Sequence, residues 1–130
     1  MFTHIKTSKE NREVVSQLTR KLNLGTENII SRIALTYSLA QDKKLDLSNI
    51  ENSGGKQYTK KVLFGEYVDY YVGMIALHYG LHVSDKDLGR YVKMHVDDGL
   101  KLLNQELESN PNIDGFDFLI KKIEQGLKKI

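Results

Sequence analysis

A near absence of proline is the feature that most constrains how this chain can fold. Proline interrupts helices and sheet interiors, and the 130 residues contain one, Pro111. Long stretches carry apolar residues at the 3.6-residue spacing of an α-helix. The sequence therefore predicts an all-α protein, a compact domain of about five helices. A short strand is expected at residues 2–6, ahead of the first helix.

Local signals set the ends of the expected helices. Thr7 and Glu10 have the spacing of a capping box at a helix start. Asn23 is expected to end that helix in a left-handed conformation, and Thr26 to cap the next one. The expected helices cover about residues 8–22, 27–41, 65–79, 85–108 and 114–129, with Gly80 ending the third and Ser84 capping the fourth. Residues 42–61 are polar and are expected to lack regular structure.

Two of these helices are apolar around most of their circumference. The helix over 27–41 and the helix over 65–79 each carry apolar residues on more than one face. A helix of this kind is buried on most sides, which in a small protein indicates packing against a second subunit. Gly73, in the middle of the second of these, is expected to allow a close helix approach.

Composition excludes several classes of protein. Hydrophobic residues make up 40% and charged residues 28%, a balance typical of a folded globular chain rather than a disordered one. There is no cysteine, which excludes disulfides, thiolate metal sites and cysteine nucleophiles. No apolar run is long enough to cross a bilayer, and the first nine residues lack a signal-peptide pattern. One cytoplasmic domain over residues 1–130 is the expectation.

Charge is distributed unevenly along the chain. The net charge is +2, but residues 1–61 carry 11 Lys and Arg against 6 Asp and Glu, whereas residues 62–130 carry 8 against 11. An excess of basic residues in one half suggests a polyanionic partner, because phosphate attracts Lys and Arg regardless of sequence. The alternative is a chance imbalance on a solvated face.

The stretch SGGK at residues 53–56 resembles a phosphate-binding loop only superficially. A Walker loop has Gly, four residues, then Gly-Lys-Ser/Thr after a buried strand. Here Ile50 stands at the first glycine position and Gln57 at the hydroxyl position. The stretch is therefore interpreted as a flexible loop, whose lysines either meet phosphate as point charges or face water.

Four groups of side chains could support other chemistry. His78 and His82 have a metal-ligand spacing, but Gly80 is expected to end the helix between them. His95 lies on an apolar stripe and is expected to be a core histidine. The pairs Asp97–Asp98 and Asp85–Asp87 could hold Mg²⁺ as in a metal-dependent nuclease, although no third carboxylate is placed by spacing.

Tyrosines cluster around residues 58–71. Tyrosine rings can stack on nucleic-acid bases. At helical spacing they are more often in a core or an interface, which is the expectation for Tyr67, Tyr70 and Tyr71. Tyr58 is left open between the two roles.

The order strand, helix, LNLGTENII, helix resembles a ribbon–helix–helix unit, in which paired strands of a dimer enter the DNA major groove. A second resemblance covers more of the chain. The segments NLGTENIISRIALTYSLAQ, SGGKQYTKKVLFGEY and HVDDGLKLL, within about residues 8–104, resemble the DNA sulfur modification protein DndE family.

The DndE resemblance implies a small helical homotetramer without a catalytic centre or cofactor. It implies binding to duplex DNA, with a preference for nicked duplex, within the machinery that replaces a nonbridging phosphate oxygen by sulfur. The partners implied are a cysteine desulfurase, a sulfotransferase-like reductase and an ATPase. The turn around Gly25 is implied to serve assembly. Asp98 stands where the family commonly has a basic residue, so a DNA contact there is not expected. The helix over about 114–129 is expected to be a lineage-specific addition.

Charge clustering selects the residues expected to contact DNA. These are Arg20, Lys21, Lys43, Lys44, Lys56, Lys60 and Lys61. Lysines at these positions would neutralise backbone phosphates and hold the duplex in place rather than read its sequence. Two alternative functions remain open, a ribbon–helix–helix repressor or antitoxin and a metal-dependent DNA-nicking enzyme.

Overall fold

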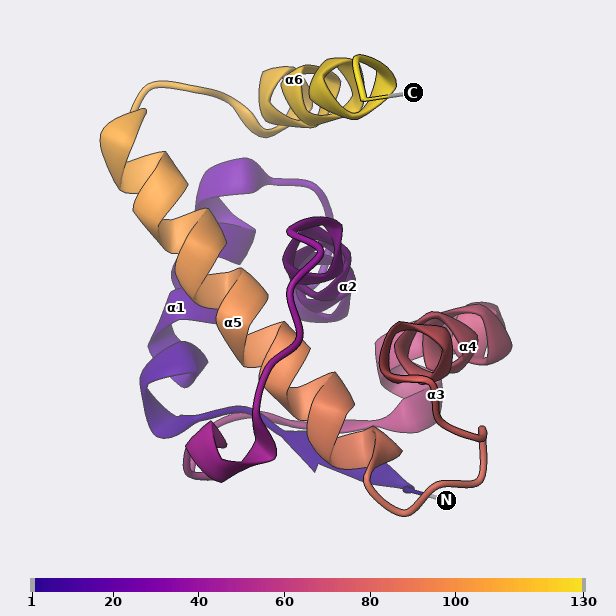
Figure 1. Cartoon of the computed structure of the whole chain (residues 1–130). Helices are drawn as coiled ribbons and strands as arrows, with labels where there is room; N and C mark the ends of the chain where they lie inside the picture. Colours follow the sequence, from indigo (N-terminus) through magenta and orange to yellow (C-terminus); the bar gives the residue numbers. More distant parts are fainter. Residues whose placement is uncertain (1, 130) are drawn as a thin grey trace.

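The chain folds as a helical protein with one small two-stranded ribbon (Figure 1). The computed structural model describes residues 2–129. In chain order the elements are β1 (His4–Lys6), α1 (Lys9–Leu22), α2 (Glu27–Ala40), the 3₁₀ turn η1 (Leu47–Asn49), β2 (Gln57–Thr59), α3 (Lys60–Phe64), the 3₁₀ turn η2 (Gly65–Tyr67), α4 (Val68–Tyr79), α5 (Leu88–Ser109) and α6 (Gly115–Leu127). The prediction of a mostly helical protein with a short N-terminal strand is confirmed.

Helix α5 is the axis on which the other elements pack. It runs through the middle of the molecule, with the ribbon at one end and α6 at the other (Figure 1). Its packing with α2 is the most extensive between any two elements of the described chain. Half of its length is buried, including Val96, Leu100 and Leu103, each fully excluded from solvent. Burial of this kind contributes about 25 cal/mol for each Å² of apolar surface.

Glycine at residue 99 permits the close crossing of α2 and α5. A Cβ atom there would lie 1.8 Å from the carbonyl oxygen of Ala34, a distance that no side chain can occupy. Gly73 serves no close approach within the single chain, because a Cβ atom there meets nothing within 4 Å, and an approach between subunits stays a prediction.

The start of α1 differs from the predicted capping box, while its end agrees. Ser8 is the N-cap, and its hydroxyl accepts a hydrogen bond from the backbone N–H of Asn11. The Thr7 hydroxyl oxygen instead accepts a hydrogen bond from the backbone N–H of Lys56, at 2.8 Å. Asn23 ends the helix at φ 50°, as expected. Thr26 is the N-cap residue of α2, but its side chain makes no capping hydrogen bond.

The segment 42–61 contains a strand that sequence periodicity did not reveal. Strand β2 pairs antiparallel with β1 in the register His4–Thr59, Ile5–Tyr58 and Lys6–Gln57. Ile5 and Tyr58 turn inward and are buried, while the other four side chains are exposed. In a ribbon–helix–helix dimer the first strand pairs with a second copy, whereas here β1 pairs within its own chain.

The expected helix over 65–79 is divided. Gly65 adopts φ 56°, a conformation that suits glycine, and it ends α3. The 3₁₀ turn η2 follows, and the regular helix α4 begins only at Val68. Gly80 ends α4 in a left-handed conformation, as predicted. The next helix begins at Leu88 with Asp87 at its N-cap, so the prediction of Ser84 as the cap is wrong.

Helix α6 is fastened to the rest of the molecule by few residues. Asp114 caps it by accepting a hydrogen bond from the Asp117 N–H. Gly115 lies against the end of α1, where a Cβ atom would be 1.9 Å from the Leu22 carbonyl oxygen. Phe118 is its one large side chain that is fully buried among those described. Other large apolar side chains of α6 are exposed, with Phe116 70% exposed and Leu127 64% exposed.

Within residues 2–129, no helix is both long and apolar enough to cross a lipid bilayer.

Candidate nucleic-acid interface

The SGGK stretch is held against the N-terminal segment rather than extending from the molecule as a free loop. The Gly55 N–H donates to the Thr7 carbonyl oxygen at 2.9 Å, and the Thr7 N–H donates to the Lys56 carbonyl oxygen at 2.8 Å. A Cβ atom at Gly55 would lie 2.2 Å from the Ser8 carbonyl oxygen. The prediction of a flexible loop is therefore wrong at Gly55, where glycine permits a close backbone contact instead.

The three lysines after this stretch lie around β2 but are held differently. The Lys56 ammonium lies 3.3 Å from a carboxylate oxygen of Glu27, and both side chains are about one-third exposed. Lys60 lies with its ammonium 5.6 Å from the centre of the Phe2 ring. Lys61 is exposed on the first turn of α3. All three are at the ribbon end of the molecule.

The other four predicted contact residues lie away from the ribbon. Arg20 and Lys21 are at the end of α1, and Lys21 donates to the Leu107 carbonyl oxygen near the far end of α5 at 3.2 Å. Lys43 and Lys44 follow α2 and are exposed. The seven predicted residues therefore form three separate groups, and only the group at β2 adjoins the ribbon.

Next to the ribbon lies a basic recess that sequence reasoning missed. Its volume is about 450 Å³, and it opens between β1, the first turns of α5 and the loop around Ser53. The lining side chains are Phe2, His4, Ile5, Lys6, Ile50, Ser53, Lys86, Arg90 and Lys93, with Gly89. We call this set the basic recess. Its cations come from segments some 80 residues apart, so no local cluster of charge in the sequence indicates the recess.

Lys93 and Asp97 form a buried ion pair behind the recess. The ammonium lies 2.7 Å from one Asp97 oxygen and 2.8 Å from the Asn52 carbonyl oxygen. The other Asp97 oxygen accepts from the Ser8 N–H at 3.0 Å and from the Asn11 amide at 2.8 Å. This carboxylate therefore joins α5 to the start of α1, and protein donors occupy both of its oxygens.

His95 is a core histidine, as predicted. Its Nδ1 lies 2.8 Å from the Ser38 hydroxyl, which donates to Asp98 at 2.6 Å, and its Nε2 lies 2.6 Å from the Tyr79 hydroxyl. Burial, with a further contribution from His78, lowers the pKa of His95 to about 4. A neutral imidazole with its proton on Nδ1 satisfies every bond in this chain.

The proposed metal ligands do not come together. His78 Nε2 bonds to the Lys43 carbonyl oxygen at 2.9 Å, whereas His82 Nδ1 bonds to the Ser84 hydroxyl at 2.7 Å. Asp85 accepts a hydrogen bond from the Asp87 N–H, and Asp98 belongs to the His95 chain. Among residues 2–129, no three His, Asp or Glu side chains are grouped so that they could hold a metal ion.

The tyrosines separate into buried and exposed ones. Tyr58, left open by the sequence, is 6% exposed and belongs to the core, and Tyr71 stacks on Phe64 with ring centres 4.6 Å apart. Tyr67 and Tyr70 are 52% and 73% exposed. These two lie on the outer side of η2 and α4, where Met74 and Leu77 continue the exposed apolar stripe.

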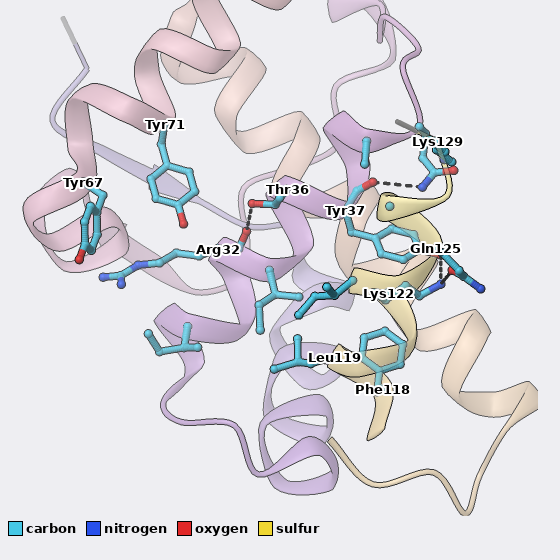
Figure 2. A pocket seen from close by; sticks show the side chains of 16 residues that line it. Arg32, Thr36, Tyr37, Tyr67, Tyr71, Phe118, Leu119, Lys122, Gln125 and Lys129 are labelled. Atoms are coloured by element: carbon cyan, nitrogen blue, oxygen red, sulfur yellow. Dashed lines mark hydrogen bonds between the residues drawn. The ribbon is translucent and has the colours of Figure 1, made fainter. Parts of the chain in front are cut away.

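A second hollow, of different character, lies between α2 and α6. Figure 2 shows side chains of α2 facing those of α6, with Tyr67 and Tyr71 at one edge. Its volume is about 630 Å³, and Ile29, Ile33, Leu119 and Ile123 give it an apolar wall. We call it the α2–α6 groove. Contiguous exposed apolar surface of this kind marks a contact with another protein, a membrane or an apolar ligand.

Three polar side chains fix α6 along this groove. The Tyr37 hydroxyl donates to Glu106 at 2.6 Å, and Lys122 pairs with the same carboxylate. Burial opposes ionisation of Glu106, but the hydrogen bonds from Lys122 and Tyr37 outweigh it, so the pKa of Glu106 lies below its ordinary value. Lys122 also lies 4.8 Å from the centre of the Tyr37 ring.

Gly25 lies in the turn before the groove. Its φ of 136° favours glycine, and a Cβ atom there would lie 3.2 Å from the Ile29 side chain. Because Ile29 lines the α2–α6 groove, the turn adjoins this apolar surface.

Fold and surface together define a small helical protein with a basic face at a β-ribbon and an apolar groove at the opposite end. The model of the family described as DNA sulphur modification protein DndE matches residues 4–111, and the chain belongs to this family. The match includes the ribbon and the cations of the basic recess, whereas α6 follows it.

Solved structures support the same fold. A DndE from Escherichia coli B7A, described as involved in DNA phosphorothioation modification, superposes with a TM-score of 0.64 at 19% identity. A glycine-to-lysine mutant of DndE, described as involved in DNA phosphorothioation, gives 0.66 at 20% identity. Each comparison covers 79% of this chain and 98% of the other. Among curated proteins, none matches the sequence.

Proposed function

We propose that this protein is a non-catalytic DNA-binding subunit of the DNA phosphorothioation machinery and acts as a homotetramer in the cytoplasm. The observation that carries the proposal is the gathering of cations at the ribbon end in a chain of the DndE family. Lys6, Lys61 and Lys86 are exposed there. Cations at a surface neutralise backbone phosphates and release counterions, which binds duplex DNA without reading its sequence.

A role in positioning DNA for partner enzymes fits how the carboxylates are used. Asp97 receives hydrogen bonds from Ser8, Asn11 and Lys93, and Asp98 receives one from Ser38. Groups held in this way support the fold. The cysteine desulfurase, the sulfotransferase-like reductase and the ATPase of the system would then supply the chemistry, and this subunit would hold the duplex, nicked or intact.

The homotetramer is supported by two separate apolar surfaces. A closed tetramer with two-fold symmetry needs two different self-complementary contacts. The α2–α6 groove provides one, and the turn at Gly25 adjoins it. The outer stripe of α4, where Tyr70 is 73% and Leu77 85% exposed, provides the other.

The proposal is tested by DNA affinity as a function of salt. Lys56, Lys60 and Lys61 are replaced by Ala together, and a fluorescent 20-base-pair duplex is titrated by anisotropy between about 50 and 200 mM KCl. Because each lost phosphate contact lowers the salt slope by about 0.9, the expected decrease is about 2, with Lys56 contributing least since Glu27 already neutralises it.

Two results would count against the proposal. Absence of salt-dependent binding by the wild-type protein would contradict DNA binding itself. Cleavage of supercoiled plasmid in Mg²⁺ or Mn²⁺, abolished by Asp98→Asn, would contradict the non-catalytic role. A nicked and an intact duplex of one sequence, titrated in parallel, measure which form is preferred.

A further inference from the structure

The basic recess differs from the rest of the ribbon end because its cations converge on one hollow. Lys6 reaches it from β1, Lys86 from the segment before α5, and Arg90 from the first turn of α5. His4 adds an imidazole beside Lys6 on the exposed side of β1. No Asp or Glu side chain is among the residues that line the hollow.

Two of these cations have little competition from the protein's own acids. Among residues 2–129, Lys6 and Lys86 make no ion pair, and both side chains are exposed. Arg90 pairs with Asp87 at 3.3 Å through one nitrogen of its guanidinium, which leaves its other donors for a ligand. A hollow with unneutralised cations attracts an anion of matching size.

The wall behind these cations is rigid. Lys93 is 6% exposed, and its ammonium donates hydrogen bonds to the Asn52 carbonyl oxygen and to the Asp97 carboxylate. Gly89 lets the N-terminal segment lie directly on α5, since a Cβ atom there would be 2.6 Å from Cβ of Phe2. The wall of the recess is therefore formed before any ligand arrives, and the ordering cost of binding falls on the exposed side chains of Lys6, Lys86 and Arg90.

We propose that the basic recess is a seat for a backbone phosphate of the bound DNA, held by Lys6, Lys86 and Arg90. This inference rests on the proposed function and adds a contact that the run of lysines at 56–61 does not include. Phe2 joins the two sets, because it lines the recess while Lys60 lies over its ring. Phe2 therefore places Lys60, next to β2, beside the recess.

The test compares two double variants of equal charge. Lys86→Ala with Arg90→Ala removes two cations of the recess. As the control, Lys121→Ala with Lys128→Ala removes two exposed lysines, one on α6 and one at its C-cap. A third variant, Ser53→Glu, puts an acid at the exposed rim without removing any cation. All are full-length chains, and circular dichroism and thermal melting verify that each is folded.

The expected result is a salt slope lower by about 2 and an affinity at least tenfold weaker for the recess variant, with a smaller loss for Ser53→Glu and the control near wild type. If the recess variant and Ser53→Glu both match the control while Lys56, Lys60 and Lys61 matter, the phosphate seat is wrong and the proposed function stands. If the wild-type protein does not bind duplex, both fail.

Discussion

The basic recess at the ribbon end and the α2–α6 groove are two hollows of one small protein, and they are lined by side chains of opposite character. The basic recess is lined by five basic side chains from three segments, whereas the α2–α6 groove is walled by isoleucine, leucine and aromatic rings. Two of the cations that line the groove are engaged with the chain itself, since Lys122 pairs with Glu106 and Arg32 donates to the Val62 carbonyl oxygen at 3.5 Å. One surface suits phosphate, and the other suits another protein surface.

The two hollows also differ in their relation to the DndE family. The cations of the recess lie within residues 4–111, which the family model matches, but α6 forms one wall of the groove and lies beyond residue 111. Assembly is therefore the property in which this chain is expected to depart most from its relatives. The proposed DNA binding at the ribbon would involve residues within the matched range.

The largest expected effect comes from the crossing that supports both hollows. Gly99→Ala forces a Cβ atom into the Ala34 backbone, which we expect to reduce the free energy of unfolding by about 3 kcal/mol or more. Gly73→Ala is the matched control, because a Cβ atom there meets open space. It should increase the free energy of unfolding by at most about 1 kcal/mol. Urea unfolding monitored by circular dichroism measures both. Equal losses at the two positions would contradict the packing described, and a loss at Gly73 alone would indicate a second copy against α4.

A comparable effect is expected from acid. The pKa of His95 is about 4 in the folded chain and about 6.5 when unfolded, so between these values the unfolded chain binds more protons. Stability is therefore full above pH 6.5, falls as the pH drops toward 4, and loses about 3 kcal/mol from this residue in total. The His95→Gln variant, which retains donors and acceptors, should lose less stability over this window. Identical pH profiles for both proteins would show that His95 is not held neutral.

A moderate effect separates the groove from the basic surface. Ile33→Asp places a charge in the groove and should weaken self-association at least tenfold in sedimentation analysis. At a concentration where the wild type and Ile33→Asp have the same oligomeric state, the salt slope of DNA binding should be the same for both. Gln105→Asp, an exposed site outside the groove, is the control. Loss of DNA binding by Ile33→Asp in the same oligomeric state would contradict the assignment of DNA binding to the basic surface alone.

The smallest expected effect concerns the attachment of α6. Lys122→Ala removes the partner of Glu106 and the contact over Tyr37, and it should cost about 1 kcal/mol because the pair is half-buried. Amide hydrogen exchange in residues 115–127 should become faster, while α5 is unchanged. Lys121→Ala, fully on the outside, should leave exchange as in the wild type.

Much of the fold could be predicted because helix signals are local. Asn23, Gly80 and Asp114 each mark a helix end in the structure as they do in the sequence. Strand β2 was missed because three residues give too little periodicity, and its pairing with β1 depends on residues more than 50 positions away. The same reasoning explains Gly55 and Gly99, whose role is set by the segment that each touches rather than by its neighbours in sequence.

DNA contact by the residues that charge clustering selected stays a prediction. The structure places the lysines at 56–61 by the ribbon, and Lys21 with its ammonium bound to the end of α5. Lys6, Lys86 and Arg90 were missed because each stands alone in the sequence and only the fold brings them together. The exposed apolar side chains of α6 show a related limit, since periodicity predicts an apolar face but not what covers it.

The most direct test of the division between the two hollows is hydrogen–deuterium exchange with and without a saturating duplex. The account predicts slower exchange in residues 2–9, 54–61 and 84–93, which carry the ribbon and the basic recess. Residues 29–41 and 115–127, on either side of the α2–α6 groove, should exchange as in the free protein. Slower exchange confined to the groove, with the ribbon end unchanged, would contradict the account.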